Sequence, residues 1–187
     1  MHGNKKLVMS FTSDIELHTG LHLYRHVIQE AVLNADRFVW IATANLKDMH
    51  IPMTRGYKPV LEIFNRMART GVTFRIVHSD LPSRPFRSTL EGFERLTSGA
   101  LELQICPRCH WKMVLVDGQF AYLGSANFTG AGLGAKGEGK RNLEIGITSR
   151  DRELVKKVEE IFDTFWIGSH CQDCAMRKNC PDPIGED

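Results

Sequence analysis

The sequence predicts an α/β fold with one mixed β-sheet flanked by helices, and three observations support this. Apolar residues in the first hundred positions alternate between helical and strand periodicity. After residue 100 the pattern changes to short strands, with Asp117-Gly118 as a hairpin turn. The chain has 187 residues, 42% of them hydrophobic and 25% charged. This composition suits one globular domain and excludes a chain that is disordered, collagen-like or a coiled coil throughout.

In the first half of the chain, strands and helices follow one another. Tyr24, Val27, Ile28 and Ala31 have the i, i+3, i+4, i+7 spacing of one helical face. A second helix ends before Gly71, which suits a helix C-cap. The elements are expected at residues 7–11 (strand), 22–34 (helix), 37–42 (strand), 59–70 (helix), 72–77 (strand) and 87–97 (helix).

The second half is richer in strands and ends in an irregular tail. Five glycines between residues 129 and 141 oppose both helix and strand, so a mobile loop is expected there. We divide the chain into a main domain, residues 1–167, and a cysteine-rich tail, residues 168–187, packed on it. In this second half of the chain, strands are expected at residues 101–105, 111–116, 119–123 and 142–148, and a helix at residues 151–166.

Charge and hydropathy indicate a cytoplasmic protein that does not bind a membrane. No apolar stretch approaches the roughly 20 residues that span a bilayer, and the N-terminal apolar run is too brief for a secretion signal. The net charge is +2 and the sequence pI about 8.3. This mild basicity permits nucleic acid as a partner without requiring it.

One segment carries a pattern typical of phosphate chemistry, H-x-K-x4-D followed by G-S-x-N. His110 and Lys112 are two residues apart on an expected strand, so they share a face. An imidazole beside an ammonium group suits a phosphate, since one can attack phosphorus and the other can neutralise an oxygen. Asp117 lies at the hairpin turn, where its carboxylate can accept backbone hydrogen bonds. Ser125 and Asn127 follow the next strand and can donate to phosphate oxygens.

This block, His110, Lys112, Asp117, Gly124, Ser125 and Asn127, resembles the signature of the phospholipase D superfamily. Glu144 is placed like the acidic residue that follows the motif in the small nucleases of that family. The resemblance covers roughly residues 18–167 and implies the phospholipase D-like fold. It further implies that Lys112 and Asn127 bind phosphate oxygens and that Glu144 orients His110. Ser125 is expected to assist by hydrogen bonding, and Asp117 to be more structural than chemical.

The same resemblance implies hydrolysis of a phosphodiester through a phosphohistidine, with no metal needed for catalysis. The mechanism uses two motif histidines, and this chain has one H-x-K motif. A homodimer whose two-fold axis brings two copies of His110 together is therefore expected.

We expect a nuclease acting on DNA or RNA. The alternatives are a phospholipid hydrolase or transphosphatidylase, for which no membrane-docking helix is visible, and a non-catalytic nucleic-acid-binding module. Basic residues that are candidates for holding a polyanion are Arg55, Lys58, Arg84, Arg87, Lys136, Lys140 and Arg141.

The cysteines form a second candidate site. Cys106/Cys109 and Cys171/Cys174 are two C-x-x-C pairs, the first resembling a zinc knuckle. Together they can supply four thiolates to a structural zinc ion, which would hold the tail against the strand before His110. The alternative is a [4Fe-4S] cluster, since Cys171, Cys174 and Cys180 resemble the C-terminal triplet of some cluster-binding nucleases, and Cys109 or Cys106 would supply the fourth ligand. Free or redox-active thiols remain the third possibility.

Overall fold

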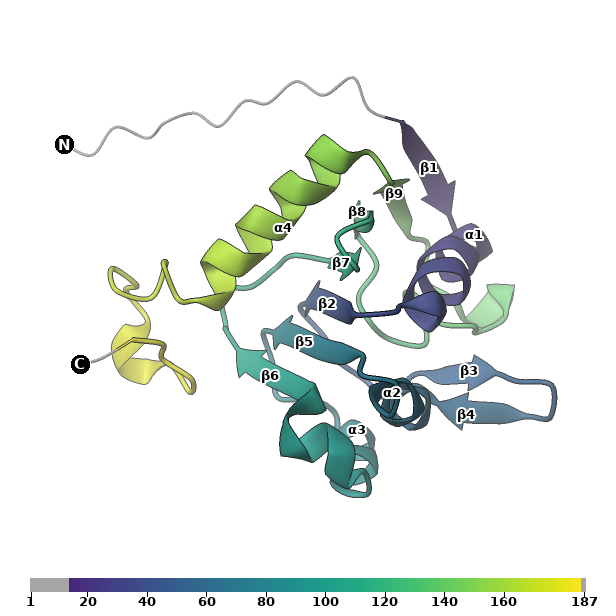
Figure 1. Cartoon of the computed structure of the whole chain (residues 1–187), viewed down its shortest axis with the longest axis horizontal. Helices are drawn as coiled ribbons and strands as arrows, with labels where there is room; N and C mark the ends of the chain where they lie inside the picture. Colours follow the sequence, from purple (N-terminus) through teal and green to yellow (C-terminus); the bar gives the residue numbers. More distant parts are fainter. Residues whose placement is uncertain (1–13, 186–187) are drawn as a thin grey trace.

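A seven-stranded sheet runs through the computed structural model of the chain, which describes residues 14–185 (Figure 1). Its strand order is β1-β9-β8-β7-β2-β5-β6. β2, β5 and β6 run parallel and the other neighbours pair antiparallel, so the mixed sheet expected from the sequence is confirmed. The strands are β1 (Ile15–Thr19), β2 (Phe38–Thr43), β5 (Thr73–His78), β6 (Leu101–Ile105), β7 (Met113–Val116), β8 (Phe120–Gly124) and β9 (Ile145–Ser149).

Three strands were not expected, and one expected strand lies outside the described residues. The strand expected over residues 7–11 belongs to the part of the chain that the structure does not describe. β1 was missed because it is an edge strand with mostly exposed side chains, so it lacks a buried apolar face. A two-stranded hairpin of β3 (His50–Pro52) and β4 (Tyr57–Pro59) was missed because three-residue strands carry no measurable periodicity.

The helices lie near the positions that the periodicity predicted, with differences in winding and in the limits of the third helix, which ends at Glu91 and not at residue 97. The helix expected over residues 22–34 is a short α-turn that continues as a π-helix and ends as a 3₁₀ turn. The third helix begins three residues earlier than expected because Ser83 caps it and Pro85 fits its first turn. The helical elements are α1 (Leu21–Leu23), η1 (Tyr24–Ala31), η2 (Val32–Asn34), α2 (Val60–Ala68), α3 (Arg84–Glu91), η3 (Leu96–Ala100), η4 (Glu138–Lys140), α4 (Arg152–Trp166) and η5 (Arg177–Asn179).

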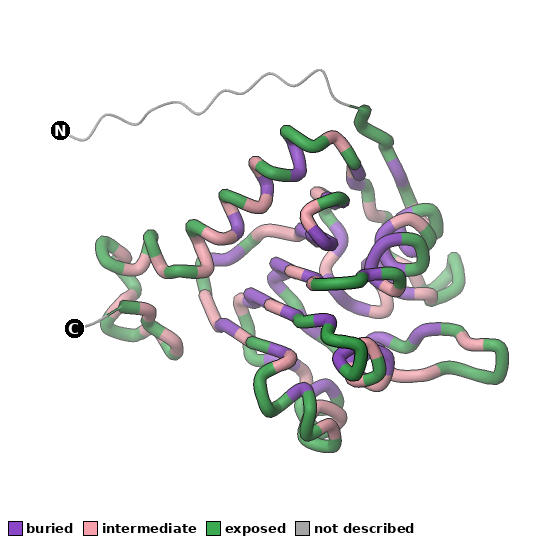
Figure 2. Tube along the Cα trace, viewed as in Figure 1, coloured by how far each residue is buried: buried purple, intermediate pink, exposed green. Residues whose placement is uncertain are grey.

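Helices cover both faces of the sheet (Figure 1), and the sheet separates two apolar clusters; Figure 2 shows the buried positions along the strands and the helices that pack on them. On one face η1 and α2 pack on the sheet, where the rings of Phe64 and Phe74 stack 4.1 Å apart. On the other face α4 packs on β7 and β8, and Phe162 stacks on Trp40 at 5.2 Å. In residues 14–185 no helix has both the length and the apolar character needed to cross a bilayer.

The pairing of β7 with β2 determines which residues meet at one edge of the sheet. The two strands run antiparallel, with Val39 opposite Val116 and Ala42 opposite Met113. The segment before β7 therefore lies beside the segment after β2. The carboxyl ends of β5 and β6 reach the same edge, because these strands run parallel to β2.

Asp117 fixes the opposite end of this strand pair. Its carboxylate accepts three backbone N–H bonds, from Asp36, Arg37 and Phe38, each 2.8 Å long. Its own backbone adopts a left-handed conformation, with φ of 55°, in the turn that Gly118 completes. The carboxylate thus ties the β7–β8 turn to the start of β2, as the hairpin pattern suggested.

We predict that Asp117→Asn destabilises the fold. The amide keeps one acceptor oxygen but places an NH₂ group against a backbone N–H, so a charge-assisted bond is lost and a donor is left unpaired. The expected loss in unfolding free energy is about 2 kcal/mol, measured by urea denaturation. Asp36→Asn is the matched control, because that side chain is exposed and the backbone donor remains. Equal midpoints for the two variants would show that the carboxylate is not an anchor.

Candidate active site and cysteine cluster

His110 and Lys112 lie in the segment that leads into β7, at the edge described above. The Nζ atom of Lys112 is 3.1 Å from Nδ1 of His110 and 2.9 Å from the His110 carbonyl oxygen. The two side chains therefore lie together, as expected, although strand β7 begins one residue after Lys112. His110 is exposed and Lys112 half-buried, so a ligand can reach both groups.

Asn127 is held rigidly beside this pair by the end of β2. Its Oδ1 atom accepts bonds from the backbone N–H groups of Ala44 and Asn45 and from the Thr43 hydroxyl, at 3.0–3.1 Å. Because the oxygen is fully used, the amide NH₂ is the group left to donate to a ligand. Sequence reasoning did not identify Thr43, Ala44 and Asn45 as the support. The only signal for them was their place directly after a buried strand.

Ser125 and Glu144 contact each other at the same edge. Ser125 Oγ donates to one carboxylate oxygen of Glu144 and accepts the Ile145 N–H at 3.1 Å. Asn142 Nδ2 donates to the other carboxylate oxygen at 3.1 Å. Within the described residues Glu144 makes no hydrogen bond to His110, so its orienting role stays a prediction. Asp117, at the far end of β7, is the one motif residue placed away from this edge.

The glycine-rich segment, residues 129–141, is packed against Asn127. Leu133 N–H bonds to the Asn127 carbonyl at 3.2 Å, and a Cβ added at Gly132 would lie 2.4 Å from that oxygen. Arg141, a candidate for holding a polyanion, instead donates to the carbonyl oxygens of Gly134, Lys136, Gly132 and Gly20. Its guanidinium thus links several backbone positions within the loop, whereas Lys136 and Lys140 remain exposed.

A shallow basic cavity of about 370 Å³ opens beside this loop. Lys47, which lines the cavity, donates its backbone N–H to the carbonyl of Phe128 at 3.4 Å, so the cavity lies beside the segment that carries Asn127. Asp48 is its one carboxylate, and Thr89 donates to it at 2.8 Å. The basic side chains that line it are Lys47, His50, Lys136 and Lys140.

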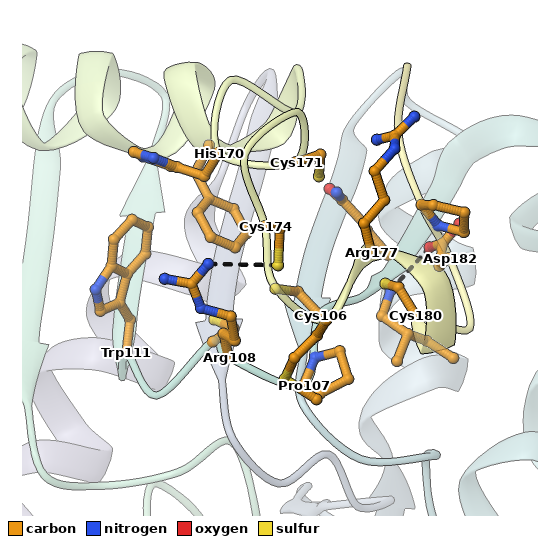
Figure 3. A pocket seen from close by; sticks show the side chains of 16 residues that line it. Cys106, Pro107, Arg108, Trp111, His170, Cys171, Cys174, Arg177, Cys180 and Asp182 are labelled. Atoms are coloured by element: carbon orange, nitrogen blue, oxygen red, sulfur yellow. Dashed lines mark hydrogen bonds between the residues drawn. The ribbon is translucent and has the colours of Figure 1, made fainter. Parts of the chain in front are cut away.

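All five cysteines line one cavity of about 290 Å³ between the β6–β7 connection and the C-terminal tail (Figure 3). The tail is held there by Asp182, whose carboxylate accepts the Ile105 N–H of β6 at 2.9 Å. The rings of Trp111 and Phe165, 4.9 Å apart, form its apolar wall. The structure thus brings the two C-x-x-C pairs and Cys180 together, from segments more than sixty residues apart.

The thiols differ in their surroundings. Burial raises the pKa of the Cys109 thiol to about 11, and burial also raises the pKa of Cys106. A hydrogen bond from Arg108, 3.4 Å from the sulfur, lowers the pKa of Cys174. The donor set is that of a structural zinc or iron–sulfur site. Among residues 14–185 no three of the sulfur atoms lie within 4.8 Å of one another, so binding would draw the thiols closer.

Comparison with known proteins identifies one matching family. The family described as "Cardiolipin synthase, PLD-like domain" matches residues 28–166. A search of curated protein sequences found no match.

Solved structures share the fold at low sequence identity. NucT from Helicobacter pylori superimposes with a TM-score of 0.59 at 13% identity, over 82% of this chain and 95% of that one. Nuc from Salmonella typhimurium, described as a phospholipase D family member, gives 0.54 at 14% identity, over 82% and 93%. Phosphatidylserine synthase from Haemophilus influenzae gives 0.56 at 18% identity, over 81% of this chain and 38% of that one.

We predict that Gly132→Ala destabilises the loop that supports Asn127. The new methyl group would overlap the Asn127 carbonyl oxygen, so the loop must shift, at a cost of about 1–3 kcal/mol in unfolding free energy. Gly137→Ala is the control, because a Cβ there meets no atom within 4 Å. Thermal unfolding of both variants measures the difference, and equal melting temperatures would contradict the packing described.

Proposed function

The chain belongs to the phospholipase D superfamily, and we propose that it is a nuclease that hydrolyses phosphodiester bonds of nucleic acid through a phosphohistidine. The observation that carries the proposal is the meeting of His110, Lys112 and Asn127 at one sheet edge. An exposed imidazole, an ammonium group and a fixed amide donor form a site for a tetrahedral anion with a nucleophile beside it.

In the proposed first step, an imidazole nitrogen of His110 attacks phosphorus and the bond to the leaving oxygen breaks. The ammonium group of Lys112 neutralises charge on the non-bridging oxygens, and the amide NH₂ of Asn127 donates a hydrogen bond to them. A second imidazole must protonate the leaving oxygen and then take a proton from water, which cleaves the phosphorus–nitrogen bond. Such general acid–base assistance contributes about 10²- to 10⁴-fold in rate.

We propose that the partner's His110 in a homodimer supplies this second imidazole. Among residues 14–185 no other histidine is followed two positions later by a lysine. Apolar side chains stand exposed on β9 and the segment before it, where Leu143 and Ile145 flank Glu144, and on β1, where Leu17 is 68% exposed. A second copy packed on this surface would bury it and bring the two sites together.

Nucleic acid is the substrate class that the charges favour. The cavity beside Asn127 is lined by Lys47, Lys136 and Lys140, which suits the phosphates on either side of a cleaved bond. The exposed Leu143 and Ile145 favour a lipid as the second candidate, because they adjoin the same site. NucT and Nuc share the fold with this chain, as does phosphatidylserine synthase, so likeness of fold does not choose between the two substrate classes.

We predict that the purified protein cleaves DNA or RNA in the presence of EDTA, and that His110→Asn lowers the rate by at least 10³-fold. Labelled DNA, RNA and phosphatidylcholine vesicles are incubated separately, and a trapped phosphoryl adduct at position 110 is sought by mass spectrometry. His22→Gln is the control, because that histidine is exposed on α1 and belongs neither to the motif nor to the basic cavity.

Two outcomes would overturn this proposal. If His110→Asn is as active as the unchanged protein, His110 is not the nucleophile. If the protein cleaves phosphatidylcholine and neither DNA nor RNA, it is a phospholipid hydrolase and not a nuclease. Sedimentation of the same sample tests the shared centre, because an active monomer would contradict it.

We propose further that Cys106, Cys109, Cys171 and Cys174 hold a structural zinc ion, with a [4Fe-4S] cluster including Cys180 as the alternative. The support is that these side chains line one cavity at the tail. Four thiolates are a complete ligand set for structural zinc.

We predict that protein purified from cells is colourless and contains zinc, and that Cys171→Ser lowers both its zinc content and its melting temperature. Elemental analysis and calorimetry measure these. A brown sample that absorbs at about 400 nm would show that the site holds the iron–sulfur cluster and not zinc. A metal-free sample with five titratable thiols would exclude both.

A further inference from the structure

A second group of metal-binding side chains lies at the opposite edge of the sheet from the cysteines. It consists of Glu16 and His18 on β1 and His26 on η1. Their potential ligand atoms all lie within 4.8 Å of one another, which holds for no other such group in residues 14–185. The mechanism proposed above uses none of the three.

The fold places these residues together by two periodicities. Glu16 and His18 are two residues apart on a strand and so face the same side. The helix that follows packs over that side, and the ring of His26 stacks on the ring of His18 with centroids 4.2 Å apart. His22, one turn earlier, adds a third imidazole at 6.5 Å from His26. His18 is 8% exposed, whereas Glu16 is open to solvent.

Each ring has a further polar neighbour, and that of His26 leaves its ligand nitrogen available. Nδ1 of His26 lies 2.9 Å from a carboxylate oxygen of Glu30, which leaves Nε2 available. Nε2 of His18 lies 2.8 Å from the hydroxyl of Thr148 on β9, and this contact would be given up when the same nitrogen binds an ion. A carboxylate behind a histidine is the common second layer of zinc sites, where it sets the tautomer and raises the basicity of the ligand.

We propose that Glu16, His18 and His26 form a binding site for Zn²⁺. Two imidazoles and one carboxylate are a known three-residue ligand set for zinc, with a fourth position left for water or another side chain. His18 Nε2 and Glu16 Oε2 are 3.3 Å apart. Zinc bonds of about 2.0–2.2 Å place neighbouring ligands of a tetrahedron about 3.3 Å apart, so these two atoms already have the separation that the ion requires.

Zinc at this site acts as a clamp on the edge of the sheet. Within residues 14–185 β1 pairs only with β9, and its exposed residues give it little apolar burial. An ion bound by β1 and η1 joins the strand to the helix that packs over it. The C-terminal end of β1 leads to Gly20, whose N–H donates to the Glu144 carbonyl oxygen at 3.4 Å. The clamp therefore supports the strand end beside the candidate active site while leaving the reaction itself to other groups.

The test compares zinc binding by the full chain and by single variants. Zinc chloride is titrated into metal-free protein by calorimetry, and bound zinc is counted after dialysis. We expect His26→Gln and Glu16→Gln each to bind one zinc equivalent fewer per chain than the unchanged protein. Glu30→Gln keeps the ligands and is expected to weaken this binding about 10- to 100-fold. Both ligand variants replace side chains that are at least partly exposed, so the fold should survive.

Two controls separate this site from the cysteines. His50→Gln removes an exposed histidine elsewhere and should leave the zinc count unchanged. In the cobalt form, the absorption lost in His26→Gln should lack thiolate-to-metal charge transfer, because no cysteine is involved. Saturating zinc should raise the melting temperature of His50→Gln by about 5–10 °C more than that of His26→Gln. Equal zinc counts and affinities in His26→Gln, Glu16→Gln and His50→Gln would overturn the proposal and leave an ordinary pair of ion contacts.

Discussion

The antiparallel pairing of β7 with β2 is the constraint on which the candidate active site depends. The two strands are held in register by ladder bonds along their length and by the Asp117 carboxylate at one end. A slip of one residue would turn every side chain of β7 to the opposite face. Because the anchor lies at the far end, the edge with His110 and Lys112 needs no buried charge of its own to stay in place. Its polar groups are thus free to meet a ligand.

The site is assembled from loops that a rigid sheet positions, as is common in α/β proteins. Asn127 shows how this is achieved, since one oxygen bonds to three donors from the end of β2 and the rest of the amide remains available. The glycine-rich loop packs on the same residue from the other side, and Arg141 binds that loop through carbonyl oxygens. Arg141, which the sequence suggested as a substrate-binding cation, therefore stabilises the loop. The exposed Lys136 and Lys140 are the basic groups of the loop that remain available to a polyanion.

Much of the fold followed from the sequence because its core elements carry clear periodicity. β6 was predicted at its observed limits, and α4 within a residue, since Asp151 caps the helix. The motif residues were found because their spacing matches the signature of the phospholipase D superfamily. What escaped prediction depends on tertiary contacts. β1 exists because β9 offers it an edge, and the contacts of Glu144 with Ser125 and Asn142 cross segments whose approach no local pattern encodes.

The C-terminal tail also contacts the exposed edge of the sheet at β6. β6 is a terminal strand, and such strands present unpaired N–H and C=O groups on which another chain can assemble. Asp182 occupies one of these positions with a carboxylate, which accepts a bond but cannot continue a ladder. The last residues of the chain thus discourage intermolecular β-pairing along β6, and a protein shortened before Asp182 would be prone to aggregate through that margin.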